Sequence, residues 1–304
     1  MSENNKKGGF FKKKKNTTAE RQASLKHNQE AILNTSTPFV IQEAYKTART
    51  NIVFAVSGSK DKSSKVICFT SASPGEGKTT SCINLAITFA QTGAKVLLID
   101  GDMRKPRMHQ YLGVVKTNGL STVLSMQAKF DDVVYHDIRP NMDLLASGSI
   151  PPNPAELLAS EAMEAFLKEV GPKYDYVFID TPPASVVTDA VALSRYVTGM
   201  VIVVREGYTT HENLEHAINL LKIANSKILG FFLNDSSPVN INYGIYQKRY
   251  GRYRYRYNYN YRYNYRYNYR YNYRYGADPL KNQKKEFHPV HFGKGVFHSS
   301  KGNV

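Results

Sequence analysis

A glycine-rich stretch followed by lysine and threonine is the part of this sequence whose residue types most directly imply chemistry. It occupies residues 72–79 and reads ASPGEGKT. Gly75 and Gly77 allow the backbone to turn its amides inward around phosphate oxygens. Lys78 can then reach the β- and γ-phosphates, and the hydroxyl of Thr79 can coordinate Mg²⁺. The pattern therefore predicts a nucleotide site, although alanine replaces the first glycine of the strict motif.

Three carboxylates follow apolar runs that have the length of buried strands. Asp100 and Asp102 come after residues 96–99, and Asp180 comes after residues 176–179. In an open α/β sheet the carboxyl ends of the strands face the ligand crevice, so these side chains are expected to meet there. Such a cluster is costly unless cations neutralise it, which predicts that Lys78 and Mg²⁺ lie beside it.

The elements that must position these residues alternate between apolar strands and amphipathic helices. The predicted helices cover residues 39–56, 78–91, 155–170, 188–197 and 212–224, and the predicted strands cover residues 65–70, 95–99, 141–146, 176–179, 200–204 and 228–233. Parallel strands need crossover connections, so this alternation indicates an α/β fold. We expect a P-loop NTPase-like, doubly wound, mostly parallel sheet with helices on both faces, plus disordered tails.

Charge is distributed very unevenly along the 304 residues, whose net charge is +16. Residues 31–235 are almost neutral, whereas the segments before and after them are strongly basic. The high isoelectric point therefore does not indicate that the central domain binds nucleic acid. We predict four parts: a basic disordered tail (1–35), a catalytic domain (36–236), a tyrosine-rich tail (237–276) and a polar C-terminal tail (277–304).

The tyrosine-rich tail is a low-complexity segment. Every second residue from Tyr253 to Tyr275 is tyrosine, and the positions between them hold only arginine and asparagine. No aliphatic residue is present to build a core, so disorder of the free segment is expected.

The two cysteines and the hydropathy of the chain exclude several protein classes. Cys68 and Cys82 lie in apolar patterns, which predicts reduced core residues and excludes a disulfide scaffold or a four-cysteine metal site. No stretch approaches the ~20 apolar residues of a membrane span, and the N-terminus lacks the apolar run of a secretory signal. A soluble, intracellular chain is expected.

Three motifs together resemble the bacterial protein-tyrosine kinases of capsule and exopolysaccharide loci, in the cytoplasmic firmicute form. They are GEGKT at 75–79, LIDGDMRKP at 98–106 and FIDTPP at 178–183. The resemblance implies an ATP- and Mg²⁺-dependent kinase that phosphorylates its own C-terminal tyrosines. It also implies that a separate transmembrane protein activates the chain, which would place the chain in the cytoplasm at the inner face of the membrane.

The resemblance also implies roles for individual residues. Lys78 would bind phosphate, Asp100 would be the base or aligner of the tyrosine hydroxyl, and Asp102 would support the metal or orient the acceptor. The metal ligands implied are Thr79, Asp100 and Asp180. The remaining nucleotide-binding residues implied are Gly75, Glu76, Gly77, Thr80 and, for the adenine edge, Asn234. Chemistry agrees, since a tyrosine with a pKa near 10 needs a carboxylate to accept its proton during transfer.

The tail and one N-terminal helix complete the implied assembly. The autophosphorylation sites would be Tyr243, Tyr246, Tyr250, Tyr253, Tyr255, Tyr257, Tyr259, Tyr261, Tyr263, Tyr265, Tyr267, Tyr269, Tyr271, Tyr273 and Tyr275. Glu43, Lys46 and Arg49 match a family motif that builds a ring of subunits, expected as an octamer, although lysine replaces its first arginine. The same residues could instead form a simple intrahelical ion pair. Other expected partners are a cognate tyrosine phosphatase and protein substrates, with no obligate nucleic acid.

The interpretation is therefore an ATP-dependent protein-tyrosine autokinase that regulates surface-polysaccharide synthesis and export. One alternative is an ATPase of the plasmid-partition or division-site type, which shares the phosphate loop and the sheet. Such ATPases usually carry a second lysine early in that loop, and residues 72–74 contain none. The other alternative is nucleic-acid binding by the tail, where arginine and tyrosine could grip phosphates and stack on bases.

Overall fold

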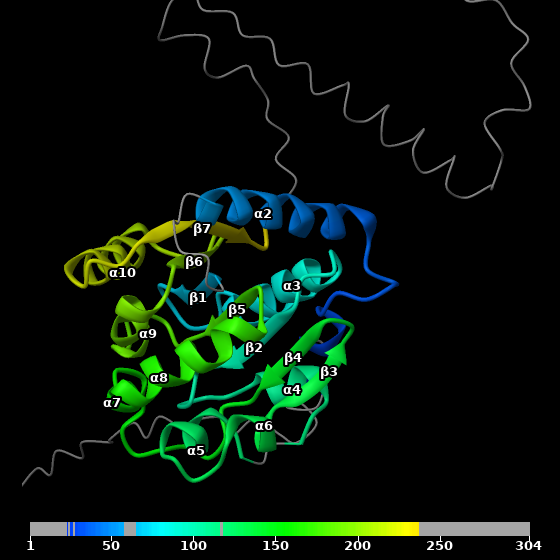
Figure 1. Ribbon diagram of the computed structural model, residues 1–304. Helices are drawn as coiled ribbons and strands as arrows, with labels where there is room; N and C mark the ends of the chain where they lie inside the picture. Colours follow the sequence, from blue (N-terminus) through cyan, green and yellow to red (C-terminus); the bar gives the residue numbers. More distant parts are fainter. Residues whose placement is uncertain (1–22, 24, 27, 58–64, 116–117, 237–304) are drawn as a thin grey trace, which may run out of the picture. The chain divides into compact units, whose positions relative to one another are not determined.

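A seven-stranded sheet forms the centre of the computed structural model, which describes residues 23, 25–26, 28–57, 65–115 and 118–236 (Figure 1). The strands are β1 (Lys65–Ser71), β2 (Val96–Asp100), β3 (Tyr135–Arg139), β4 (Met142–Leu145), β5 (Tyr176–Asp180), β6 (Gly199–Arg205) and β7 (Ile228–Asn234). Their order is β3-β4-β2-β5-β1-β6-β7. Every neighbouring pair is parallel except β3 and β4, so the sheet is mostly parallel with one antiparallel edge strand.

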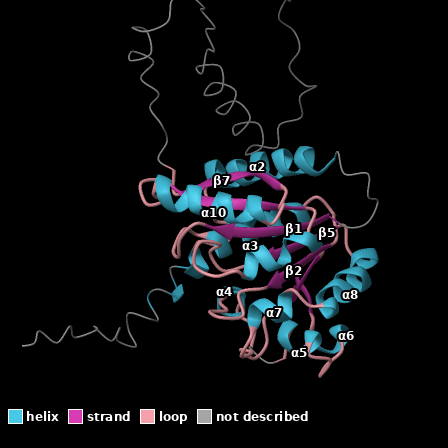
Figure 2. Ribbon diagram, turned by 90° about the vertical axis from the view of Figure 1, so that its left-hand side faces the viewer, coloured by secondary structure: helices cyan, strands magenta, loops and turns pink. Residues whose placement is uncertain are grey.

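Helices cover both faces of this sheet (Figures 1 and 2). They are α2 (Phe39–Ser57), α3 (Lys78–Ala90), α4 (Met108–Leu112), α5 (Leu120–Leu124), α6 (Phe130–Val133), α7 (Pro154–Leu158), α8 (Glu161–Val170), α9 (Asp189–Leu193) and α10 (His211–Ile223). Buried side chains of α2 and α3 pack on one face, and those of α5 to α10 pack on the other. The predicted doubly wound α/β fold is confirmed.

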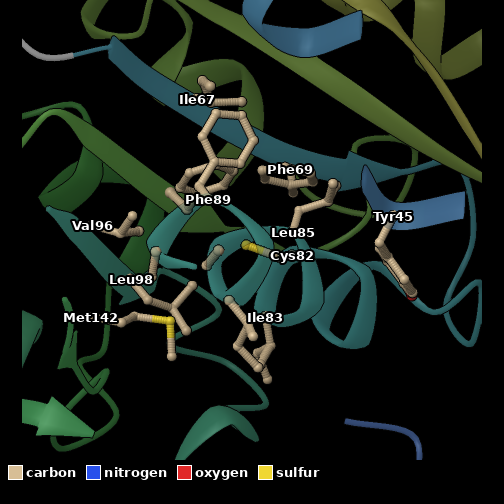
Figure 3. Packing of buried hydrophobic residues seen from close by; sticks show 14 of the residues in the cluster. Tyr45, Ile67, Phe69, Cys82, Ile83, Leu85, Phe89, Val96, Leu98 and Met142 are labelled. Carbon is tan, nitrogen blue, oxygen red and sulfur yellow. The ribbon is translucent and has the colours of Figure 1, made fainter. Parts of the chain in front are cut away.

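The core consists of two apolar layers that alternate along the central strands. Ile67 and Phe69 of β1 belong to the layer under α2 and α3, which Figure 3 shows, whereas Cys68 faces the opposite layer. This period of two follows from the pleat of a strand whose two faces are both buried. Phe69 stacks on Phe178 of the neighbouring β5, with 5.5 Å between ring centroids. The aromatic pair therefore joins the two strands that carry the candidate site.

The strand order brings the candidate chemistry to one edge. β2, β5 and β1 are consecutive neighbours, so their carboxyl ends lie side by side. Asp100 and Asp180 end β2 and β5 in direct register. The phosphate loop follows β1 at the same edge, so residues separated by about one hundred positions in the chain converge there.

The structure differs from the sequence-based elements in detail. The helix expected over residues 155–170 is two helices, because the Ser160 side chain accepts a hydrogen bond from the Met163 amide and caps α8. The helix expected over 188–197 is the short α9 followed by a 3₁₀ turn. Strand β3 and helices α4 to α6 were not predicted, because they are short and carry no clear apolar period.

The packed domain begins before residue 36. Ile32 and Leu33 are buried, and the Asn84 side chain on α3 accepts a hydrogen bond from the Leu33 amide and donates one to the carbonyl of Ala31. The segment assigned to the N-terminal tail therefore includes residues that complete the core over α3. The rest of that tail, and both predicted segments beyond residue 236, lie outside the described residues.

Both cysteines are fully buried free thiols, as predicted. Burial raises the pKa of Cys68 to about 12, so this thiol stays protonated and unreactive. Among the described residues, no helix has the length and apolar character required to cross a bilayer.

Candidate active site

The phosphate loop connects the end of β1 at Ser71 to the start of α3 at Lys78. Gly75 and Gly77 have φ angles of 84° and 85°, a left-handed conformation that side chains other than glycine's rarely adopt. The loop therefore curls as the sequence predicted and ends at a helix N-terminus. The free amides and partial positive charge of that terminus favour an anion.

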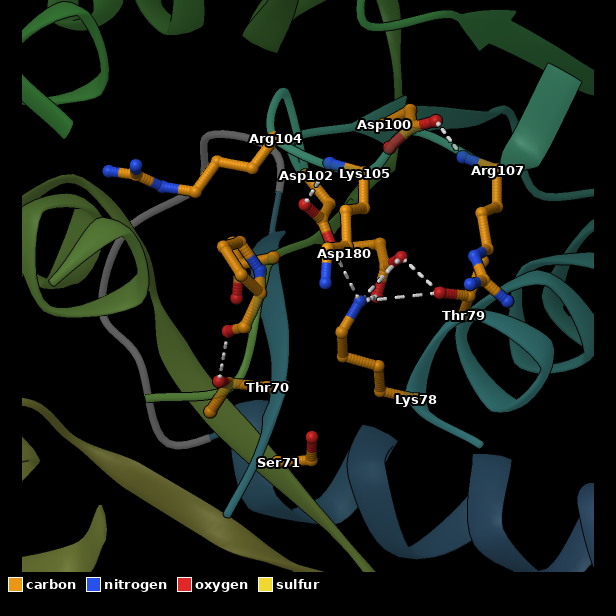
Figure 4. Close-up of polar contacts among 12 residues, drawn as sticks. Thr70, Ser71, Lys78, Thr79, Asp100, Asp102, Arg104, Lys105, Arg107 and Asp180 are labelled. Atoms are coloured by element: carbon orange, nitrogen blue, oxygen red, sulfur yellow. Dashed lines mark hydrogen bonds and ion pairs between the residues drawn. The ribbon is translucent and has the colours of Figure 1, made fainter. Parts of the chain in front are cut away.

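Lys78 is the centre of a cluster of polar side chains at this helix N-terminus (Figure 4). Its Nζ lies 3.2 Å from Oδ2 of Asp102 and 3.3 Å from Oδ2 of Asp180. The hydroxyl of Thr79 donates to the same Asp180 oxygen at 2.6 Å. The structure thus brings together four predicted site residues, contributed by α3, by the segment after β2 and by the end of β5.

Burial makes the charges of this cluster strongly interdependent. The side chains of Lys78 and Asp180 are only 12% and 1% exposed. Burial alone would lower the pKa of Lys78, but the carboxylates of Asp180 and Asp102 outweigh that effect and raise it. Burial raises the pKa of Asp180, against the opposing influence of Lys78 and Thr79. One ammonium group therefore holds together carboxylates that would otherwise repel each other.

Asp100 lies beside this cluster but has different partners. Its Oδ2 accepts hydrogen bonds from the amides of Arg107 and Met108, at 3.2 and 3.1 Å. Its Oδ1 is buried and has no hydrogen-bond partner among the described residues. Burial, followed by repulsion from Asp180, raises the pKa of Asp100 to about 7. We call Asp100, Asp102 and Asp180 the acidic wall of the phosphate loop.

The acidic wall fits a divalent cation that phosphate groups help to hold. An unpaired buried carboxylate oxygen is costly, and a cation or a hydroxyl donor would satisfy it. Among the described residues, no group of three or more histidine, cysteine or acidic side chains has the arrangement of a metal cage. Mg²⁺ does not require such a cage, because it commonly takes one or two carboxylates together with substrate phosphates and water.

The opposite side of the phosphate loop is held by residues 205–213, which follow β6 and open α10; we call them the supporting loop. The hydroxyl of Tyr208 donates to the carbonyl of Pro74 at 3.0 Å. Arg205 donates to the carbonyl of Gly75 at 3.4 Å, and Asn213 donates to the hydroxyl of Ser73 at 3.2 Å. The carbonyls on this side of the phosphate loop are therefore already occupied.

Glu76 connects the two loops through a completely buried carboxylate. One of its oxygens accepts a hydrogen bond from the Ala72 amide at 2.9 Å, and the other accepts one from the Thr209 hydroxyl at 2.7 Å. The side chain predicted to contact nucleotide thus closes the loop on itself and ties it to the supporting loop.

Asn234 also supports the phosphate loop. Its Nδ2 donates to the carbonyl of Glu76 at 3.0 Å. A Cβ atom on Gly77 would lie 2.1 Å from that nitrogen, so only glycine leaves room for the contact. The side chain predicted to recognise the adenine edge is therefore engaged with the loop backbone.

Arg104 ties the segment after β2 to helix α9. Its guanidinium forms two-pronged contacts of 2.9–3.2 Å with Asp189, whose side chain is completely buried. This planar pairing fixes the loop that carries Asp102. The 98–106 motif contained this arginine, but no local pattern indicated its distant partner.

Sequence reasoning also missed the supporting loop. Arg205, Tyr208 and Thr209 belong to no recognised motif, yet they follow a strand that neighbours β1. That position at the carboxyl end of a parallel strand was the available signal. Of the remaining predicted site residues, Thr80 follows Thr79 in the first turn of α3.

The residues expected to build a ring of subunits lie on α2. Lys46 pairs with Glu43 at 2.9 Å, which is the intrahelical ion pair considered as the alternative. Arg49 points toward the domain and donates to the carbonyl of Thr88 on α3 at 2.7 Å. Within one chain, Arg49 therefore fixes α2 to α3.

Comparison with known proteins gives consistent results. Residues 64–230 match the AAA domain family. The chain is 43% identical over 205 residues to the tyrosine-protein kinase YwqD of Bacillus subtilis, which covers 67% of this chain and 85% of that relative. The crystal structure of the chimerical protein CapA2B2 superposes with a TM-score of 0.61 and 32% identity, covering 71% of this chain and 98% of that one.

Some relatives are much longer than this chain. The putative tyrosine-protein kinase EpsB of Ralstonia nicotianae is 36% identical over 213 residues, which cover 70% of this chain but only 28% of that relative. The matched region is therefore a minor part of that relative.

Proposed function

The chain belongs to the family of bacterial tyrosine-protein kinases, and from this premise we propose that it transfers the γ-phosphoryl group of ATP to its own C-terminal tyrosines. The observation that carries the proposal is the acidic wall. It places a buried carboxylate with an unpaired oxygen and a raised pKa beside the lysine and threonine of a nucleotide-binding loop.

Binding of the triphosphate depends on the phosphate loop and Lys78. Backbone amides of the loop and the N-terminus of α3 receive the phosphate oxygens. Lys78 exchanges part of its contact with Asp102 and Asp180 for the β- and γ-phosphates. Mg²⁺, held by Thr79 and Asp180, would neutralise charge on the phosphates and leave transfer to positioning and electrostatics. Asp100, the third metal ligand that the resemblance implies, is assigned to the proton instead.

Proton transfer is the task we assign to Asp100. Phosphorylation of a tyrosine hydroxyl breaks the bond between the γ-phosphorus and its bridging oxygen and releases the hydroxyl proton. A carboxylate with a pKa of about 7 accepts that proton more effectively near neutral pH than an ordinary aspartate does. Asp102 is tied to Lys78 and to the amide of Lys105, and it orients the site around the acceptor.

The proposed substrate is the segment from Tyr243 to Tyr275. It is rich in arginine as well as tyrosine, and residues 236–276 contain no acidic residue. Each phosphate adds about −1.5 to −2 charges, so roughly five phosphates would cancel the charge of this segment. Phosphorylation therefore converts a basic tail into a neutral and then an acidic one.

The proposed assembly is a ring in which one subunit receives the tail of its neighbour. Glu43 and Lys46 lie together on α2 and are partly exposed, whereas Arg49 is engaged with α3. Each added phosphate would weaken the attraction between the tail and the active site of the neighbouring subunit, and the ring would dissociate. Light scattering tests this by measuring the mass of the assembly. An equal mass for the fully phosphorylated and the unmodified protein would contradict dissociation on phosphorylation.

The cellular setting is also proposed from the family. A transmembrane activator would hold the kinase at the inner face of the membrane, and a tyrosine phosphatase would remove its phosphates. The kinase and its activator would regulate polysaccharide synthesis and export. Co-purification of the chain with the membrane protein of its own locus tests the first of these partners.

Intact mass and tyrosine mapping after incubation with Mg-ATP test the central proposal. Stepwise phosphate additions between Tyr243 and Tyr275, lost in Lys78→Met, would support it. ATP hydrolysis without phosphotyrosine would contradict it and favour the partition-type ATPase. Salt-sensitive nucleic-acid binding by the tail without phosphotyrosine would favour the alternative of a nucleic-acid-binding protein.

A further inference from the structure

Tyr208 differs from the other tyrosines of the described residues in its exposure. The residue is 51% exposed, whereas the other six are buried or half-buried. Tyr45 lies in the core, and the hydroxyls of Tyr174 and Tyr196 donate to Asp143 and to the carbonyls of residues 159–160. Tyr208 is thus the most exposed tyrosine in the described part of the domain, and the one most accessible to a kinase.

The Tyr208 hydroxyl rests directly against the phosphate loop. It donates to the carbonyl of Pro74 at 3.0 Å, and a Cβ built on Gly75 would lie 3.7 Å from the same oxygen. The hydroxyl therefore acts as a donor to a loop whose shape determines how nucleotide is held. A group added to this oxygen must change that contact.

An arginine lies beside the same ring. The guanidinium carbon of Arg205 is 5.3 Å from the Tyr208 ring centroid. The guanidinium also pairs with Asp235 at 2.9 Å and reaches the carbonyl of Gly75 at 3.4 Å. The Arg205 side chain is 39% exposed, so it has room to turn toward a new anion.

We propose that Tyr208 is itself phosphorylated by this kinase and that its phosphate weakens nucleotide binding. The inference rests on the proposed function, because ATP is the phosphoryl donor. The bond between the γ-phosphorus and its bridging oxygen breaks, and a bond to the Tyr208 hydroxyl oxygen forms. The hydroxyl proton passes to a carboxylate of the acting site, and ADP leaves.

The expected effect on the phosphate loop follows from charge. A phosphorylated oxygen at Tyr208 cannot donate to Pro74, and the phosphate repels that carbonyl. Arg205 gains a stronger, charge-assisted partner in the phosphate and releases Gly75. Two of the contacts that hold the outer side of the loop are lost together, and about two negative charges are added beside an anion site.

Mapping of phosphotyrosine on the full chain tests the modification. The wild type, Tyr208→Phe and the matched control Tyr196→Phe are incubated with Mg-ATP, and the Lys78→Met chain serves as a separate acceptor for the active one. Phosphate at Tyr208 in every chain that retains it, with none at Tyr196, supports the inference. Phosphorylated tail tyrosines with an unmodified Tyr208 overturn it and leave the proposed function intact. A chain without any phosphotyrosine overturns both.

Nucleotide affinity before and after the reaction tests the consequence. In the wild type we expect affinity for a fluorescent ATP analogue to fall about tenfold once Tyr208 carries phosphate. Tyr208→Phe should begin a few-fold weaker and show no further loss when the two chains are compared at the same number of tail phosphates, counted by intact mass. An equal fall in both chains would assign the effect to the tail and overturn the regulatory role of Tyr208.

Discussion

The two sides of the phosphate loop are built on opposite principles. The acidic wall gathers three buried or nearly buried carboxylates near one ammonium group, and no described residue pairs with Oδ1 of Asp100. On the supporting side, the loop accepts hydrogen bonds from the side chains of Arg205, Tyr208 and Thr209. The acidic wall offers polar groups that a ligand can contact, whereas the polar groups of the supporting side are paired within the protein.

This difference separates chemistry from positioning. Unsatisfied buried charge costs stability in the empty protein and becomes favourable only when phosphate, a cation or a substrate hydroxyl arrives. Satisfied hydrogen bonds leave no buried polar group unpaired, and they hold the loop in the shape to which the ligand binds. Substitutions on the acidic wall should therefore affect transfer, and those on the supporting side should affect nucleotide affinity.

The largest effect is expected for Lys78→Met. The substitution removes the ammonium group that reaches the phosphates and leaves Asp102 and Asp180 without their counter-ion. We expect the rate of tyrosine phosphorylation, followed by intact mass, to fall about 1,000-fold or more. The exposed Lys95 provides a matched control, and an equal loss in Lys95→Met would contradict the assignment.

Asp100→Asn should have the next largest effect on transfer. Without a proton acceptor the turnover number should fall about 100-fold, while affinity for ATP changes less. Asp102→Asn is the comparison, because that side chain contacts Lys78 directly and should affect affinity as well. A larger loss of turnover in Asp102→Asn would reverse the two roles.

The same Asp100 substitution should stabilise the empty protein above neutral pH. The folded pKa of about 7 is higher than the ordinary value of 3.8, so the folded chain retains a proton that the unfolded chain releases. This contribution lowers the wild-type free energy of unfolding as pH rises from about 4 to about 7, by at most about 4 kcal/mol. Asp100→Asn removes it. Urea titrations at pH 5 and pH 8 measure the difference, which should be larger at pH 8.

Glu76→Gln sharpens the comparison from the supporting side. The amide keeps the size of the carboxylate, but its nitrogen cannot accept, so the Thr209 hydroxyl has to change from donor to acceptor, and two charge-assisted hydrogen bonds become neutral ones. We expect KM for ATP to rise about tenfold with little change in kcat. Glu212→Gln, an exposed position on α10, is the control. A fall in kcat without a change in KM would place Glu76 with the chemistry.

Thr209→Val should have the smallest effect. It removes one neutral hydroxyl donor to Glu76 and one acceptor for the Arg205 amide. A change in KM for ATP of about threefold to tenfold is expected. Steady-state kinetics measure the change, with Thr210→Ser as the control because it retains the hydroxyl that caps α10. A fall in turnover number as large as that of Asp100→Asn would remove the distinction between the two sides.

The same distinction explains what the sequence could predict. The phosphate loop and the three aspartates are local patterns at strand ends, so their convergence followed from the parallel sheet alone. The contacts of Glu76 with Thr209, of Arg104 with Asp189 and of Asn234 with Glu76 span 133, 85 and 158 positions of the chain, with no short-range signal. These contacts within the protein were therefore not predicted, because side-chain direction depends on packing that a motif does not contain.

Strand β7 has a consequence for local opening of the domain. β7 lies at one edge of the sheet and pairs with β6 alone among the described strands, so its separation breaks fewer backbone hydrogen bonds than that of a central strand. The side chain of Asn234, at the end of β7, occupies the space where a side chain of residue 77 would lie, and it donates a hydrogen bond to the Glu76 carbonyl of the phosphate loop. Separation of β7 therefore removes a support of the nucleotide site. Nucleotide should in turn slow amide hydrogen exchange in β7 while leaving exchange in β3, at the opposite edge, unchanged.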